Sequence, residues 1–304
     1  MRGAARFGRM RAALGGHPAA PFVVGIGRSG TTLLRLMLDS HPQLAIPPET
    51  HFVPDVIGLC RSGADAHRLA EEVAASRHWA DLGVDRAELE RRFRELGSPR
   101  ADRVLRAFYT LYAERQGKPR WGDKTPAYLR RMALIANALP EARFVHLIRD
   151  GRDVVLSRRR RGMGAEVDIG RSAQRWRNRI VTARRQGDRL GRRYLELRYE
   201  DLVADPEDSL RRICGHIGLG YDPAMLRYHE RAPERLQELN RDLPAAGERD
   251  ARPAAERMAA HALAAEPPSD ERAGAWREQM PAADREQFER VAGDLLRELG
   301  YDEA

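Results

Sequence analysis

A short apolar strand, a glycine-rich turn and a helix follow one another near the start of the chain, and they constrain the fold most. Residues 21–26 read PFVVGI, a run of β-forming residues typical of a buried parallel strand. Residues 31–39 are rich in leucine, and the pattern stops before Ser40-His41-Pro42, as a helix does ahead of proline. This order predicts the first half of a β-α-β unit.

Two further segments repeat the alternation of strand and helix. Strands are predicted at residues 143–148 and 194–198, followed by helices at 152–161 and 206–217. Asp205 suits the N-cap of the last helix, because proline follows it at the first helical position. The alternation predicts an α/β fold, with a P-loop-like parallel sheet covered by helices on both faces.

The remaining segments divide the chain around this sheet. We predict a basic N-terminal segment at residues 1–20 and a single domain over 21–304. A helical insertion is expected at about 55–118. Residues 243–270, rich in Ala, Pro and Glu, are interpreted as a lid, because long segments inside compact domains are often functional, and a plain surface excursion stays open as the alternative. A helical pattern at 272–299 closes the chain.

The composition favours an intracellular protein that binds anions. Fifty-three Lys and Arg face forty-five Asp and Glu, and arginine dominates the excess. The guanidinium group binds oxyanions in bidentate fashion. Aromatic residues are only 6% and are not interleaved with basic ones, which argues against nucleic acid. Cys60 and Cys214 lack zinc-ligand spacing, and no signal peptide or membrane span is evident, so we expect a cytoplasmic location without membrane contact.

The turn after the first strand has the character of a phosphate-binding loop. Glycines allow the backbone to approach an anion at a helix N-terminus. Gly25, Gly30 and Thr32 fit the Walker A spacing, but Thr31 stands where its lysine belongs. The missing lysine argues against a kinase or NTPase, although that class stays open. A non-catalytic nucleotide-binding module and a glycine turn without a ligand also stay open.

The segment GIGRSGTTLLRLMLDSHPQLAIPPETHF resembles the 5′-phosphosulfate loop of sulfotransferases that use 3′-phosphoadenosine-5′-phosphosulfate (PAPS), closest to the tyrosylprotein branch. The resemblance implies the sulfotransferase fold and transfer of a sulfo group to a hydroxyl, leaving adenosine 3′,5′-bisphosphate (PAP). It also implies which residues hold the 5′-phosphosulfate: Arg28, Ser29, Gly30, Thr31 and Thr32.

A second anion site is predicted at the end of the strand over 143–148. Arg149 ends this strand, and Ser157 lies eight positions later, near the same face of the following helix. The two side chains can therefore meet one phosphate. RFVHLIRDGRDVVLSRRRRG resembles the 3′-phosphate motif of the same family, which implies this role for Arg149 and Ser157 and adds Arg161 as a further ligand.

Sulfo transfer requires a base for the acceptor hydroxyl and cations for the leaving phosphate. By the resemblance, Glu49 is the base, while Lys124 and Arg28 stabilise the leaving phosphate. His51 is the rival base, because histidine is best suited to proton transfer near neutrality. No metal is expected, since Arg and Lys supply the positive charge.

Two weaker matches concern the nucleotide site. Tyr199 corresponds to a tyrosine of that site in the tyrosylprotein branch, although a core role is equally open. Residues 272–276, RAGAW, resemble the late segment that closes over the nucleotide.

The acceptor is where the chain departs from the tyrosylprotein branch. Two arginines that favour acidic peptides in that branch are replaced by His51 and Asp55. We therefore expect a small-molecule hydroxyl as acceptor, with apolar walls from the helical insertion. A protein-tyrosine sulfotransferase is the alternative, with Arg61 or Arg68 replacing the missing pair. The sequence leaves room for a homodimer.

Overall fold

The computed structural model of the protein describes residues 16–160, 168–245 and 251–301. Most of the predicted basic N-terminal segment, residues 1–15, and the predicted ligand Arg161 lie outside the described residues. The single domain over residues 21–304 stays a prediction.

A four-stranded parallel sheet forms the centre of the molecule. Its strands are β4 (Asp123–Lys124), β1 (Ala20–Gly25), β5 (Ala142–Ile148) and β6 (Tyr194–Arg198), in that spatial order. Phe22 of β1 pairs with Asp123 on one side and Phe144 on the other. All six residues of β1 are buried, as expected for a strand between two parallel neighbours with both faces covered.

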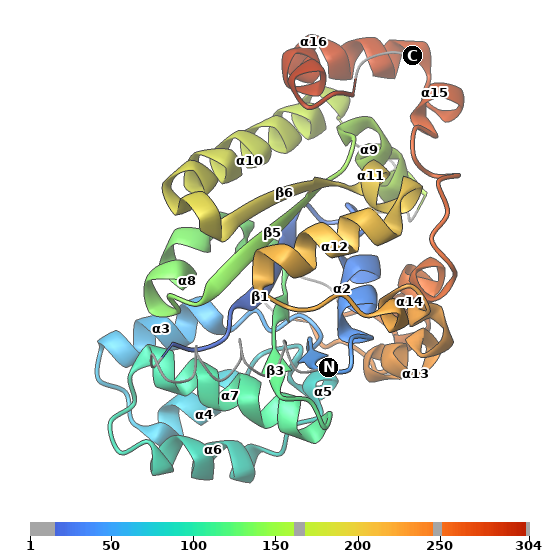
Figure 1. Ribbon diagram of the computed structural model, residues 1–304. Coiled ribbons are helices and arrows are strands. Elements are labelled where there is room, and N and C mark those ends of the chain that lie inside the picture. The colour runs from blue at the N-terminus through green and yellow to red at the C-terminus, as the bar shows by residue number, and fades with distance from the viewer. Residues whose placement is uncertain (1–15, 161–167, 246–250, 302–304) are drawn as a thin grey trace.

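Helices cover both faces of this sheet, which confirms the predicted fold class (Figure 1). Because side chains alternate along a strand, Phe22 packs on one face and Val23 on the other. The face with Phe22 carries α8 (Met132–Ala138), α9 (Gly151–Arg159), α10 (Ile169–Leu190) and α16 (Ala282–Glu298). The face with Val23 carries α2 (Thr31–Asp39), α11 (Tyr199–Ala204), α12 (Pro206–Ile217) and α13 (Ala232–Leu236).

The predicted helical insertion forms five helices beyond the β4 edge of the sheet. They are α3 (Val53–Arg61), α4 (Ala66–Ala74), α5 (Trp79–Leu82), α6 (Arg86–Glu95) and α7 (Ala101–Arg115). The side chains of Asp65 and Asp85 cap α4 and α6 by accepting hydrogen bonds from backbone N–H groups. The apolar faces of these helices are buried against one another and against the core.

A second, two-stranded parallel sheet links the two regions that carry the predicted catalytic groups. It pairs β2 (Leu44–Ala45) with β3 (Arg120–Trp121). Because β2 precedes Glu49 and β3 precedes Lys124, this pairing brings the two segments side by side.

The predicted lid, residues 243–270, is partly helical. Leu243 and Arg252 form an isolated antiparallel bridge, and α14 (Ala254–His261) follows. The chain then reaches α15 (Trp276–Gln279). The short helical turns are η1 (Pro126–Arg130), η2 (Gly191–Arg193), η3 (Pro223–Met225), η4 (Tyr228–Glu230), η5 (Gln237–Leu239) and η6 (Ala262–Ala265). Within the described ranges, no helix is both long and apolar enough to cross a membrane.

Candidate active site

The glycine-rich turn joins β1 to α2 and carries two residues with left-handed backbone conformation. Arg28 has φ 81° and Gly30 has φ 88°. A Cβ on Gly25 would lie 2.7 Å from the carbonyl oxygen of Leu147, so only glycine lets β1 run this close to β5 at that point. The turn presents Gly27, Arg28, Thr31 and Thr32 to one cavity. Ser29 is buried behind them, and its N–H donates to the carbonyl of Ile26 at 3.1 Å.

Tyr199 packs directly under this turn. A Cβ on Gly30 would lie 2.4 Å from a carbon of the Tyr199 ring. The Arg149 guanidinium lies 4.4 Å from the centroid of the same ring, a cation–π contact. Tyr199 therefore supports the loop and Arg149 from below and is not part of the cavity surface.

Arg28 connects the turn to the second predicted anion site. Its Nε donates to Oγ of Ser157 at 3.1 Å, and both residues line the cavity. Arg149 is buried behind them: its Nη1 donates to the carbonyl of Arg28 at 3.3 Å, and its Nη2 to the carbonyl of Arg272 at 2.6 Å. The structure thus brings Arg149 and Ser157 into contact with Arg28, which the sequence assigns to the other phosphate site, and their roles as anion ligands stay a prediction.

The segment at residues 272–276 is fixed beside this group by Asp153, which the sequence did not indicate. The N–H groups of Gly274 and Trp276 donate to the two carboxylate oxygens of Asp153, at 2.8 and 2.9 Å. Arg272 thereby reaches both Arg149 and the cavity surface. This placement agrees with the weak sequence match to a segment near the nucleotide.

Glu49 and Lys124 form an ion pair on the wall of the same cavity. Nζ of Lys124 donates to Oε1 of Glu49 at 2.8 Å. The neighbouring Thr50 holds the segment in place, because its N–H donates to Oγ1 of Thr125 at 3.0 Å and its hydroxyl to Oδ2 of Asp123 at 2.8 Å. These contacts are buried, so the backbone beneath Glu49 is well fixed.

The charge state of Glu49 suits a base that is ionised at neutral pH. Burial raises the pKa of Glu49, but the Lys124 ammonium and the His51 ring outweigh it and hold this pKa well below its ordinary value. Nε2–H of His51, the rival base, donates to Oε2 of Glu49 at 2.9 Å, and His51 does not line the cavity. Glu49 does line it, which favours Glu49 as the group that meets an acceptor.

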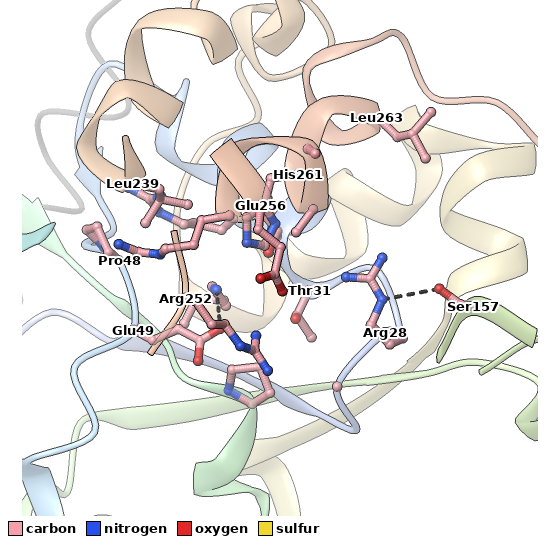
Figure 2. A pocket seen from close by; sticks show the side chains of 18 of the residues that line it. Arg28, Thr31, Pro48, Glu49, Ser157, Leu239, Arg252, Glu256, His261 and Leu263 are labelled. Atoms are coloured by element: carbon pink, nitrogen blue, oxygen red, sulfur yellow. Dashed lines mark hydrogen bonds and ion pairs between the residues drawn. The ribbon is translucent and has the colours of Figure 1, made fainter. Parts of the chain in front are cut away.

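The cavity has a volume of about 890 Å³ and joins the two sets of residues. Figure 2 shows Arg28 and Ser157 on one side and Glu49 with Pro48 on the other. Glu256, His261 and Leu263 lie over the space between them. One cavity is therefore lined by four of the predicted anion ligands, a carboxylate and a lysine: Arg28, Thr31, Thr32, Ser157, Glu49 and Lys124.

The walls of the cavity correct one expectation. The helical insertion was expected to line the acceptor space, but among its described residues only His78 reaches the cavity. Its apolar side chains face inward because they form the core of the insertion. The apolar lining comes instead from Leu239, Leu243 and Leu263, in and beside the segment interpreted as a lid. Sequence periodicity offered no signal for them.

Arg61, Arg68 and Asp55 also lie elsewhere than expected. Arg68 pairs with Glu71 and Glu72 on the exposed face of α4, and Arg61 is exposed on α3. Asp55 is exposed in the first turn of α3, outside the cavity lining, so it cannot repel a ligand there at contact distance. The arginines on the cavity surface besides Arg28 and Arg272 are Arg35, Arg158, Arg160, Arg179, Arg252 and Arg257.

A family model described as the sulfotransferase family matches residues 21–223. Among curated proteins, protein-tyrosine sulfotransferase 1 of Danio rerio is 28% identical over 219 residues, covering 69% of this chain and 56% of that protein. The protein-tyrosine sulfotransferase of Drosophila melanogaster is 29% identical, with 69% and 40% covered. The nodulation protein NoeE of Sinorhizobium fredii is 29% identical, with 68% and 51% covered. The chain spans about half the length of these relatives.

Two solved structures share the fold over nearly their whole length. The sulfotransferase domain of the Synechococcus PCC 7002 olefin synthase superposes with a TM-score of 0.60 at 24% identity, covering 95% of this chain and 98% of that domain. The sulfotransferase domain from the curacin biosynthetic pathway gives 0.61 at 21% identity, with 92% and 98% covered. At these identities the likeness concerns the fold alone.

Proposed function

The chain belongs to the sulfotransferase family, and we propose that it transfers the sulfo group of PAPS to the hydroxyl of an acceptor. One observation carries the proposal: the Arg28–Ser157 contact and the Glu49–Lys124 pair open onto the same cavity. The first pair suits the phosphates of the donor, and the second suits proton transfer and charge stabilisation at the acceptor end.

In the proposed reaction, the acceptor oxygen attacks sulfur in line with the leaving phosphate. The new oxygen–sulfur bond forms, the bond from sulfur to the bridging phosphate oxygen breaks, and PAP keeps that electron pair. Glu49 takes the acceptor proton. Lys124, which is bound to Glu49 in the free enzyme, exchanges this contact for the bridging oxygen, where it and Arg28 stabilise the developing charge.

The donor is tested by ligand-dependent melting. PAP should raise the melting temperature, because a ligand that binds only the native state stabilises it by mass action. ATP with Mg²⁺ should raise it much less, since Thr31 stands at the position of the Walker lysine and the family resemblance assigns Arg149 and Ser157 to a 3′-phosphate that ATP lacks. Equal shifts by the two nucleotides would contradict the donor assignment and favour a kinase or NTPase.

We propose a small-molecule hydroxyl as the acceptor. The cavity lies within the size range of small-ligand pockets and has to hold the donor as well. Its apolar lining by Leu239, Leu243 and Leu263 suits a hydrocarbon framework. The second candidate is a tyrosine in an acidic protein segment. The arginines on the cavity surface favour it, as does the similarity to protein-tyrosine sulfotransferases.

The two acceptors are separated by steady-state assays with a panel of phenols and alcohols and with an acidic tyrosine peptide. We expect turnover of members of the panel. Leu263 is 47% exposed, so Leu263→Ser should leave the fold intact while raising the KM of an apolar acceptor by about fivefold to tenfold. Efficient sulfation of the peptide alone, unaffected by this change, would establish the second candidate and leave the donor assignment standing.

A further inference from the structure

His51 is held in a strained turn against the proposed base. The N–H of Phe52 donates to the carbonyl of Thr50 at 2.7 Å, which closes a three-residue turn with His51 at its centre and φ 58°. A γ-turn with positive φ is rare and strained, and a non-glycine residue there persists only where its surroundings fix it. This turn places Nε2 of His51 at 2.9 Å from Oε2 of Glu49.

A second histidine holds the ring of His51 from the other side. The rings of His51 and His78 stack with centroids 4.7 Å apart and an interplanar angle of 26°. Nδ1 of His78 lies 3.2 Å from Oδ2 of Asp81, and Asp81 accepts two hydrogen bonds from Arg257 of α14. Burial lowers the pKa of His78, so a neutral ring that donates to Asp81 lies against His51.

These contacts divide the two oxygens of Glu49 between two partners. Lys124 occupies Oε1 and His51 occupies Oε2. When Lys124 shifts to the leaving phosphate, Oε1 becomes the oxygen open to the acceptor. The Glu49 side chain is 29% exposed, so without a second contact it would be free to change rotamer at that moment.

We propose that His51 is a positioning residue for the reaction, which holds Oε2 of Glu49 through a hydrogen bond from its Nε2–H so that Oε1 faces the acceptor hydroxyl. The inference rests on the proposed sulfo transfer. The charged and titratable groups around His51 are Glu49, Lys124, His78, Asp81, Asp123 and Arg257.

The test compares His51→Gln with His51→Ala. The glutamine amide can donate to Glu49 and alanine cannot, while both residues carry the same strain at positive φ. We expect kcat to fall about tenfold in H51A, with less than about a threefold loss in H51Q. The melting shift produced by PAP should be equal in both. If H51A does not fold, His51→Asn replaces it, since Asn tolerates positive φ and is too short to reach the same oxygen.

The possible outcomes distinguish a failure of the proposed sulfo transfer from a failure of the positioning role of His51. If the wild-type enzyme binds PAP but sulfates no acceptor, the proposed function fails and the role of His51 fails with it. If the wild type is active and H51A matches it in kcat, only the positioning role is overturned. A loss in H51A that comes with an equal loss in PAP binding would indicate a structural role and would also overturn it.

Discussion

Replacing Glu49 by Gln is expected to lower kcat by about a hundredfold or more while the affinity for PAP stays nearly unchanged. The amide keeps the shape of the side chain and can still accept a hydrogen bond from Lys124, but it cannot take the acceptor proton. Rapid-quench or steady-state assays give kcat, and the melting shift produced by PAP reports donor binding.

The same variant has a consequence for stability that depends on pH. Because the pKa of Glu49 is depressed in the folded protein, its ionised form stabilises the fold above the ordinary glutamate pKa. This stabilisation is lost as the pH falls through the lowered folded value. The melting temperatures of the wild type and E49Q should therefore differ most at neutral pH and converge in acid.

Glu256→Gln is the matched control for this prediction. Glu256 also lines the cavity, from α14, and the change removes the same charge without touching Lys124 or His51. We expect E256Q to keep a kcat within about threefold of the wild type. An active E49Q combined with an inactive E256Q or H51A would show that Glu49 is the wrong base.

The parts of the site that were predictable from the sequence lie on locally encoded elements. The apolar strand at 21–26, the glycine turn and the Leu-rich helix are each determined by neighbouring residues in the sequence. β1, the loop and α2 could therefore be located from these local patterns alone. The spacing of Arg149 and Ser157 likewise follows from adjacent elements, because Arg149 comes directly after β5 and Ser157 lies in α9. The position of Glu49 followed from the register of the resembling segment.

The parts that were missed depend on contacts between distant residues. Arg257 meets Asp81 across 176 positions, and Thr50 meets Asp123 across 73. No periodicity signals such pairs, because each partner alone looks like an ordinary polar residue of a helix or turn. Helices do form between residues 53 and 115, but the direction in which their apolar faces point is decided by tertiary packing, and these faces point away from the cavity.

The second large effect is expected from Gly30→Ala, which tests whether the loop over Tyr199 is as tightly fitted as the structure shows. Two costs add at this position. Alanine at φ 88° costs about 1–2 kcal/mol, and its Cβ would lie 2.4 Å from the Tyr199 ring, an overlap that costs about 1–3 kcal/mol more. The ring cannot retreat without disturbing Arg149, whose guanidinium lies 4.4 Å from its centroid.

Gly63→Ala separates these two costs. Gly63 has φ 80° but nothing within 4 Å of an added Cβ, so the control carries the backbone strain without the overlap. In urea denaturation we expect G63A to lose about 1–2 kcal/mol of unfolding free energy, and G30A about 2–5 kcal/mol. G30A should also lose most of the PAP-induced melting shift, because the loop and Arg149 move together, whereas G63A should keep it in full. Equal losses of stability in the two variants, with PAP binding intact in both, would mean that the loop has room to adjust and that Tyr199 does not fix its shape.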